Sequence, residues 1–264
     1  MFGVAVSKNL YSAMQADQIT SGAIPSTCVA AANLADATCA PVITRQRYRS
    51  IVQNASTAGG GALQFDDTYL FDGTRTAGTA VNLGRRDEGS GTQAGSNATF
   101  LGIGCAGSAA LADLTAAPTA AGATETVTVN QTTGAVVSQL SVAGVNAIGI
   151  VSRENSPTST GAWGFLKLDG TYPLTANATT GKYDYFTEEF LYCRSGTTAE
   201  EAKLCTDIQS STTQTPAPAA GLPLFTNSTG AFALVNLFTG YPTAPATGTF
   251  YRTLGNTCGK SFAQ

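Results

Sequence analysis

The sequence predicts an α/β protein. Segments with helical periodicity alternate with short apolar or alternating runs that are typical of strands, which is the pattern of this fold class. The chain has 264 residues, 43% of them apolar, so it can bury a sizeable core in one large or two modest domains. Charged residues make up only 12%, about half the usual share. Hydroxyl and amide side chains replace them, as in many exported and cell-surface proteins.

The elements expected in the first 101 residues follow hydrophobic periodicity and helix-start signals. Thr44 is a candidate N-cap, and Tyr48, Ile51 and Val52 follow it at helical spacing. The arginines between them are expected to form a solvated helix face. The expected elements are the strand Phe2–Val6, the helix Leu10–Ala16, the loop Ser21–Val42, the helix after Thr44, the buried strand Ala80–Leu83 and the helix Ala94–Leu101.

The second half of the chain continues the alternation. Asn146–Val151 is a β-branched run suited to a strand covered on both faces. Asp169-Gly170 is typical of a turn. The expected strands are Glu125–Val129, Asn146–Val151, Phe165–Leu168 and Phe186–Cys193; the expected helices are Gly134–Leu140, Glu200–Ile208 and Gly230–Thr239.

Composition excludes several classes of function. The chain has no histidine, so it can form no Ser-His-Asp triad, no Cys-His pair and no histidine-ligated metal site by itself. Its net charge of −3 provides no basic stripe, which argues against a nucleic-acid partner. No uncharged apolar stretch is long enough to span a bilayer, and the first residues do not resemble a signal peptide. We expect no cofactor, no metal and no membrane span, and we expect any export signal to lie outside this sequence.

The six cysteines favour disulfides and an oxidising compartment. Their count is even, their spacing is wide, and none forms the Cys-x-x-Cys pair of zinc ribbons or redox sites. A disulfide that closes a short loop stabilises a fold by about 3 kcal/mol. The expected pairs are Cys28–Cys39, Cys193–Cys205 and, by elimination, Cys105–Cys258. The alternative is a cytosolic protein with six buried free thiols.

The most informative segment is Arg85-Arg86-Asp87-Glu88-Gly89-Ser90-Gly91-Thr92, which lies between a predicted strand and a predicted helix. This arrangement directs backbone N–H groups, the Ser90 and Thr92 hydroxyls and the positive end of a helix dipole toward one place. Arg86 can bring a guanidinium group to it. Such a site suits phosphate, sulfate or a carboxylate. The alternative is an ordinary N-cap turn beside a solvated arginine pair.

The order of these landmarks resembles the substrate-binding protein of the high-affinity phosphate ABC transporter, a type II periplasmic binding protein. It resembles a group of related exported bacterial proteins still more closely. The segment from Arg86 to Thr92 is similar to the family's phosphate-binding Arg-x-x-Gly-Ser-Gly-Thr motif. The other landmarks, in chain order, are Phe2–Val6, Tyr48–Val52, Gly134–Leu140 with Ala147–Ile150, and Phe165–Gly170 with Tyr172-Pro173.

The resemblance implies a type II periplasmic-binding-protein-like fold with a mixed sheet and flanking helices. Residues 1–185 would form one full lobe, the family's second, and residues 186–264 the returning C-terminal part of the first lobe. The ligand-binding residues that it implies are Arg86, Ser90, Gly91 and Thr92. Nothing here corresponds to the family's early Thr/Ser cluster and aspartate. The chain is therefore either a fragment of a longer exported precursor or a protein that has lost half of the cleft.

We predict non-catalytic capture of a small oxyanion, phosphate first, by a periplasmic, cell-surface or secreted protein, with an ABC permease as the partner. One alternative is a structural or surface protein that keeps this fold and self-assembles, as a filament for example, through an exposed sheet edge. A second alternative is a phosphate-ester hydrolase, for which carboxylates could supply a general base. Those carboxylates are Asp87, Glu88, Glu154 and Asp169. No nucleophile with an adjacent base is visible, so no catalytic residue is assigned.

Two further features have ordinary interpretations. Trp163, between small residues, is expected to pack inside the lobe rather than to bind a ligand. Arg153-Glu154 follows a predicted strand, where ligands bind in open α/β sheets, and is either part of the cleft or a surface ion pair.

Overall fold

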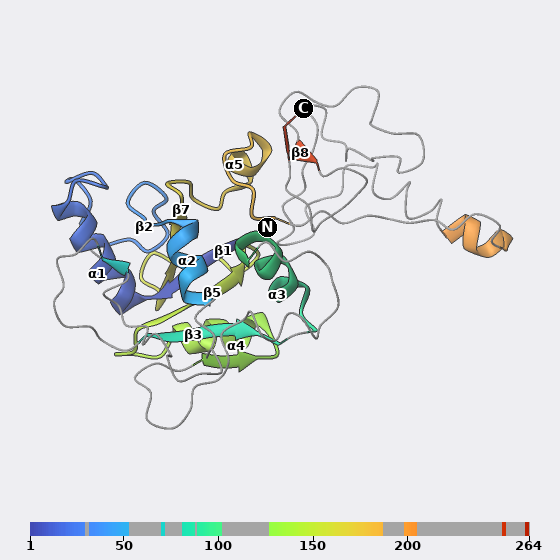
Figure 1. Ribbon diagram of the computed structural model, residues 1–264, viewed down its shortest axis with the longest axis horizontal. Helices are drawn as coiled ribbons and strands as arrows, with labels where there is room; N and C mark the ends of the chain where they lie inside the picture. Colours follow the sequence, from blue (N-terminus) through green and yellow to red (C-terminus); the bar gives the residue numbers. More distant parts are fainter. Residues whose placement is uncertain are drawn as a thin grey trace. The chain divides into compact units, whose positions relative to one another are not determined.

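The largest sheet in the described residues has five strands, is mixed and has flanking helices (Figure 1). The computed structural model describes residues 1–29, 32–52, 70–71, 81–87, 89–101, 127–186, 198–204, 250–251 and 262–263. The sheet has the order β4-β3-β5-β1-β6, with the bounds β1 (Phe2–Ser7), β3 (Asn82–Arg86), β4 (Val127–Asn130), β5 (Ala147–Ser152) and β6 (Trp163–Phe165). A two-stranded sheet pairs β2 (Val42–Ile43) with β7 (Lys167–Leu168). The predicted α/β class is confirmed.

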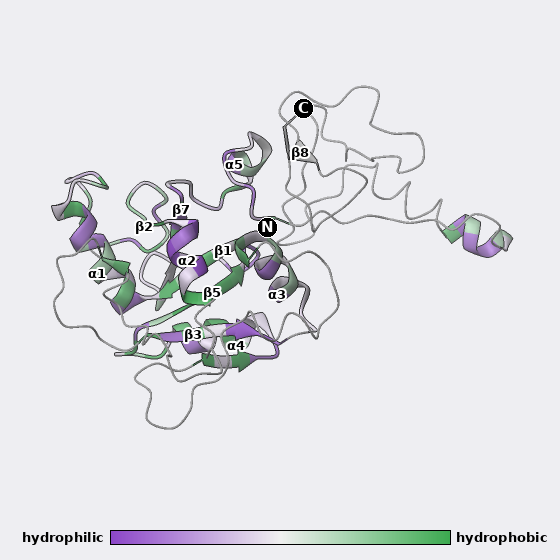
Figure 2. Ribbon diagram, in the orientation of Figure 1, coloured by the Kyte–Doolittle hydropathy of each residue, from purple (hydrophilic) through white to green (hydrophobic). Residues whose placement is uncertain are grey.

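Strand direction divides the five-stranded sheet into two parts. β3 pairs in parallel with β4 and β5, whereas β1 pairs antiparallel with β5 and β6. Every residue of β5 is buried, as its β-branched sequence predicts for a strand covered on both faces. Figure 2 shows β1 and β5 as the hydrophobic centre of the sheet.

Helices cover both faces of this sheet. They are α1 (Lys8–Thr20), α2 (Arg45–Val52), α3 (Gly91–Ser96), the π-helix η2 (Asn97–Leu101) that continues α3, and α4 (Thr133–Leu140). A Cβ on Gly149 would lie 3.0 Å from Val136 of α4, and a Cβ on Gly164 would lie 2.7 Å from the Tyr11 ring of α1. Gly149 and Gly164 pair with adjacent residues of β1. Because adjacent residues of a strand face opposite sides, Cβ atoms on these two glycines would point to opposite faces of the sheet. Hence α1 and α4 lie on opposite faces.

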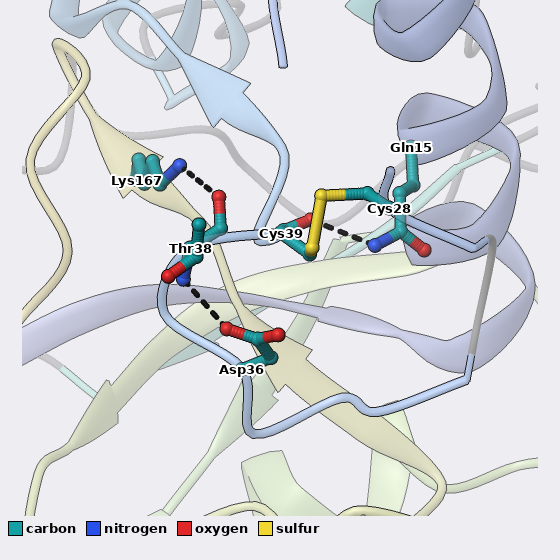
Figure 3. Close-up of a disulfide and its surroundings, with 6 residues drawn as sticks. All are labelled: Gln15, Cys28, Asp36, Thr38, Cys39 and Lys167. Carbon is teal, nitrogen blue, oxygen red and sulfur yellow. Dashed lines mark hydrogen bonds between the residues drawn. A yellow bond between two sulfur atoms is a disulfide. The ribbon is translucent and has the colours of Figure 1, made fainter. Parts of the chain in front are cut away.

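The Cys28–Cys39 disulfide closes the loop after α1, so this predicted pair is confirmed. Gln15 Nε2 donates to the Cys39 carbonyl at 2.7 Å, as Figure 3 shows. Gln18 Nε2 donates to the Val42 carbonyl, and Gln18 Oε1 accepts from the Val42 N–H. The side-chain amide thus bonds both backbone groups of Val42, in the way that the backbone of a neighbouring strand would. The cysteines that lie outside the described residues are Cys105, Cys193, Cys205 and Cys258. Their pairing stays a prediction.

The prediction of one strand over Phe165–Leu168 is wrong, because the chain changes sheet within it. The Leu166 N–H donates to the Val4 carbonyl of β1, whereas the Lys167 N–H donates to the Pro41 carbonyl before β2. The backbone partners thus change within one residue, and this change produces β6 and β7 in place of a single strand.

Two helices are longer than predicted. The helix expected over Leu10–Ala16 runs from Lys8 to Thr20. The helix expected from Ala94 begins at Gly91, because Ser90 is the last residue with an extended backbone. Along the described residues, no helix combines the length and the apolar character that crossing a membrane requires.

The chain divides into two compact units, Met1–Pro173 and Leu174–Gln264. In the second unit, the described elements are α5 (Thr175–Thr179), a helix over residues 199–204, β8 (Phe250–Tyr251) and β9 (Phe262–Ala263). The predicted strand Phe186–Cys193 lies outside the described residues except for Phe186, and the predicted helix Gly230–Thr239 lies wholly outside them. The assignment of the units to lobes stays a prediction.

Candidate functional site

The predicted anion-binding segment lies at the carboxyl edge of the parallel strands. β3 and β4 run in the same direction, so the turns after Arg86 and Asn130 lie at the same edge of the sheet. α3 follows the first turn and α4 the second. Leu83 and Ile150 line a recess with residues of α2 and α3, and the alternation of the strands places these two side chains on the face opposite α4. Two helices on opposite faces therefore begin at one edge, where ligands commonly bind in open α/β sheets.

Ser90 is the N-cap of α3 but does not use its hydroxyl as a cap. Its backbone is extended, with φ −79° and ψ 125°, and its carbonyl accepts from the Ala94 N–H at 2.9 Å. The side chain makes no capping hydrogen bond, although Ser90 is only 8% exposed. The N–H groups of Gly91 and Thr92, in the first turn of α3, have no acceptor among the described residues. A hydroxyl and two amides thus remain as donors at the start of the helix.

Arg86 is held by the turn between β4 and α4. Its Nε donates to the Asn130 carbonyl at 3.2 Å, Nη1 to Thr133 Oγ1 at 2.9 Å and Nη2 to the Gln131 carbonyl at 2.7 Å. These bonds use three of the five N–H groups of the guanidinium. The side chain is 15% exposed, and its Nη2 lies 3.9 Å from Asp87 Oδ1. Arg86 therefore supplies a mostly buried positive charge that is already partly engaged.

The two consecutive arginines point to opposite faces of the sheet. Gly84 faces α4, since its Cβ would contact Val136 and Gln139, and Arg86 lies two residues further on the same face. Arg85 faces the recess between α2 and α3. The residues that line this recess are Tyr48, Val52, Leu83, Gly84, Arg85, Arg86, Gln93, Ser96 and Ile150. Burial raises the pKa of the Tyr48 phenol there. The structure thus brings Arg86 and Ser90 to one edge, and their convergence on one anion stays a prediction.

Gln93 connects the end of β3 to α3, and the sequence analysis did not identify it. Its Oε1 accepts from the Arg86 backbone N–H at 3.0 Å, and its Nε2 donates to Asn97 Oδ1 at 3.0 Å. Gln93 is 8% exposed and Asn97 5%. The sequence signal that could have identified Gln93 was a pair of amide side chains four residues apart, directly after the turn, because residues at this spacing are neighbours on a helix.

Of the carboxylates considered for hydrolysis, the three in the described residues have different neighbours. Asp169, a turn residue with φ 49°, accepts from the Arg45 N–H and Nε, both at 2.9 Å, and so caps α2. Glu154 Oε1 accepts from the Ser152 hydroxyl at 2.7 Å. Asp87 lies beside Arg86, and Glu88 falls outside the described residues. No group of three or more metal-ligating side chains occurs within the described ranges.

Arg153 and Trp163 have packing roles. Arg153 Nε donates to the Pro173 carbonyl at 2.9 Å, and its guanidinium lies 5.6 Å from the centre of the Phe165 ring. Arg153 does not line the recess, and it forms no ion pair with another described residue. Trp163 is 7% exposed and packs edge-to-face on Phe165.

Comparison with known proteins yields no relative: no protein-family model, no curated protein and no solved structure matches this chain. The resemblance to phosphate-binding proteins therefore depends on the residues of this sequence alone.

Proposed function

We propose that this chain is a non-catalytic, extracytoplasmic solute-binding-like protein that captures a small oxyanion, with phosphate as the first candidate. The observation that carries the proposal is the unused hydroxyl of Ser90. Ser90 is only 8% exposed, lies in the turn between β3 and α3, and makes no capping bond with its side chain. It lies beside the N–H groups of Gly91 and Thr92. An oxyanion could accept hydrogen bonds from all three donors and would also interact favourably with the helix dipole.

The electrostatic part of the proposal depends on Arg86. Its charge lies at the same sheet edge, mostly buried, where charges interact more strongly than in water. The bonds to the β4–α4 turn fix the guanidinium, and two of its N–H groups remain for a ligand. The nearby Asp87 carboxylate offsets part of this charge. We therefore expect modest affinity for anions in this chain alone.

The proposal includes a fold, a compartment and a partner. The fold would be that of a type II periplasmic binding protein, with Met1–Pro173 as most of one lobe. The Cys28–Cys39 disulfide supports an oxidising compartment, such as the periplasm, the cell surface or the extracellular medium. The partner would be the permease of an ABC transporter.

A backbone substitution at Gly91 tests the proposal directly. Proline is tolerated at the first helical position and requires an extended preceding residue, which Ser90 provides. A Cβ on Gly91 would meet no atom within 4 Å. Gly91→Pro removes one N–H donor, whereas the control Gly91→Ala keeps it. In calorimetric titrations with phosphate and sulfate, we expect Gly91→Pro to weaken binding by about tenfold and Gly91→Ala to bind like the wild type. A wild-type chain that binds neither anion would refute the proposal.

One observation favours the alternative of self-assembly. β4 is a terminal strand of the five-stranded sheet, and on it Thr128 is exposed and Val129 is 41% exposed. An edge strand of this kind can pair with another chain. Ordered polymers in electron micrographs that disappear in a Val129→Lys variant would support this function. A monomer that binds phosphate would contradict it.

A further inference from the structure

Asn130 joins three elements at the proposed anion site. It is the last residue of β4 and is 7% exposed. Its Nδ2 lies 2.9 Å from Gln139 Oε1 of α4, 3.1 Å from the Thr128 carbonyl and 3.4 Å from the Arg85 carbonyl. A single buried amide therefore links the end of β3, the end of β4 and α4.

The backbone carbonyl of Asn130 holds the segment that leads into α3. It accepts from the Asp87 N–H at 3.1 Å and from Arg86 Nε at 3.2 Å. Two donors satisfy both lone pairs of a carbonyl oxygen. If this peptide group rotated, Asp87 would lose a backbone partner and Arg86 one of its three anchors. The side-chain amide opposes this rotation because it fixes Asn130 to elements on both sides.

We infer that Asn130 is a positioning residue of the anion site. It holds Arg86 and Asp87 in place, so that the turn presents the Ser90 hydroxyl and the Gly91 N–H to the oxyanion. Asn130 acts through these residues and requires no contact with the ligand. The inference depends on the proposed function, to which it adds a residue that controls the geometry of the donors.

The test compares Asn130→Ala with Gln139→Met. The first variant removes the amide. The second removes one of its partners, keeps a side chain of similar length, and leaves the bonds to the two carbonyls. ¹⁵N NMR spectra would follow hydrogen exchange at the Asp87 N–H and Arg86 Nε–H, and titrations with phosphate and sulfate would give the affinities. We expect about tenfold faster exchange and about tenfold weaker binding in Asn130→Ala. We expect values within about twofold of the wild type in Gln139→Met. If Asn130→Ala does not fold, Asn130→Ser, which keeps a hydroxyl donor, replaces it.

The outcomes separate this inference from the proposed function. No response of the wild-type chain to either anion overturns the proposed function, and the inference with it. Anion binding by the wild type that is unchanged in Asn130→Ala overturns the inference alone. The inference also fails if Gln139→Met weakens binding as much as Asn130→Ala, because the effect would then follow a general loss of packing around α4.

Discussion

At the scale of single residues, two N-caps at the same sheet edge use their side chains differently. Thr132 Oγ1 accepts from the Ala135 N–H at 3.1 Å and so caps α4. Ser90 has the same extended backbone at the start of α3 but makes no such bond. Ser, Thr, Asp and Asn are preferred at this position because their side chains accept from the first turn. The Ser90 hydroxyl therefore remains without a capping partner, and the proposed function assigns it to the oxyanion.

This difference gives opposite expectations for two alanine variants. Thr132→Ala should lower the free energy of unfolding by about 1 kcal/mol, the usual value of a cap, and should leave phosphate affinity close to that of the wild type. Ser90→Ala should leave stability nearly unchanged and weaken phosphate binding by about tenfold, since a hydrogen bond to a charged group is lost. Urea denaturation and calorimetry would measure both quantities. An equal loss of stability in the two variants would show that Ser90 acts as an ordinary cap.

At the scale of elements, glycines allow β3, β5 and α4 to approach one another closely. Gly149 of β5 pairs with Gly84 of β3. A Cβ on Gly149 would lie 2.7 Å from the Gly84 carbonyl oxygen and 3.0 Å from a methyl carbon of Val136. The first of these atoms belongs to the backbone of a central strand and cannot move without shifting the strand. The pairing of β5 with β3, the strand that leads into the candidate site, therefore depends on the absence of this side chain.

We expect Gly149→Ala to lower the free energy of unfolding by about 1–3 kcal/mol, the usual cost of overpacking. Gly134→Ala in α4 is the matched control, because its Cβ would have its nearest neighbour at 3.8 Å. There alanine should leave stability unchanged or raise it by up to about 1 kcal/mol, through its higher helix propensity. Thermal and urea unfolding would measure both variants. Equal stability of Gly149→Ala and the wild type would contradict the close packing of β3 and β5.

At the scale of the whole molecule, buried tyrosines make the fold sensitive to alkaline pH. Burial raises the pKa of the Tyr11, Tyr48 and Tyr172 phenols, and the Tyr11 hydroxyl has no hydrogen-bond partner within the described chain. The unfolded chain loses these protons near pH 10, where the folded chain still holds them. The stability from the neutral phenols is thus fully present below about pH 10 and is lost as the pH rises toward the folded pKa values.

Lys167 opposes this trend. Burial lowers its pKa, against the effect of Asp36, so its contribution to stability rises with pH in the range just below its unfolded pKa of about 10.4. Three phenols outweigh one partly exposed amine. We therefore expect the urea midpoint to fall between about pH 9.5 and 11.5.

The Tyr48→Phe variant is the control for this titration. It keeps the edge-to-face contact with Phe100, at 4.6 Å between ring centres, and removes one titrating hydroxyl. Its urea midpoint should decrease less steeply with pH than that of the wild type. Identical slopes would show that Tyr48 does not contribute to alkaline unfolding.

The sequence by itself determined the local features of this protein. The alternation of elements, the strand, turn and helix around Ser90, the amphipathic α2 and the short Cys28–Cys39 loop follow from interactions between residues close along the chain. Periodicity, turn chemistry and loop closure report such interactions directly. The function of the turn was predicted from the same local pattern and stays a proposal.

Only the tertiary structure decided which side chains surround that turn. Arg86 contacts residues 44 to 47 positions further along the chain, and Asn130 reaches back to Arg85. These contacts exist because β4 lies beside β3 in the sheet. Because successive side chains of a strand point to opposite faces, Arg85 and Arg86 lie on different sides of the sheet. Contacts between distant segments depend on the order of the strands in the sheet. That order cannot be inferred from the hydrophobic periodicity of a single segment.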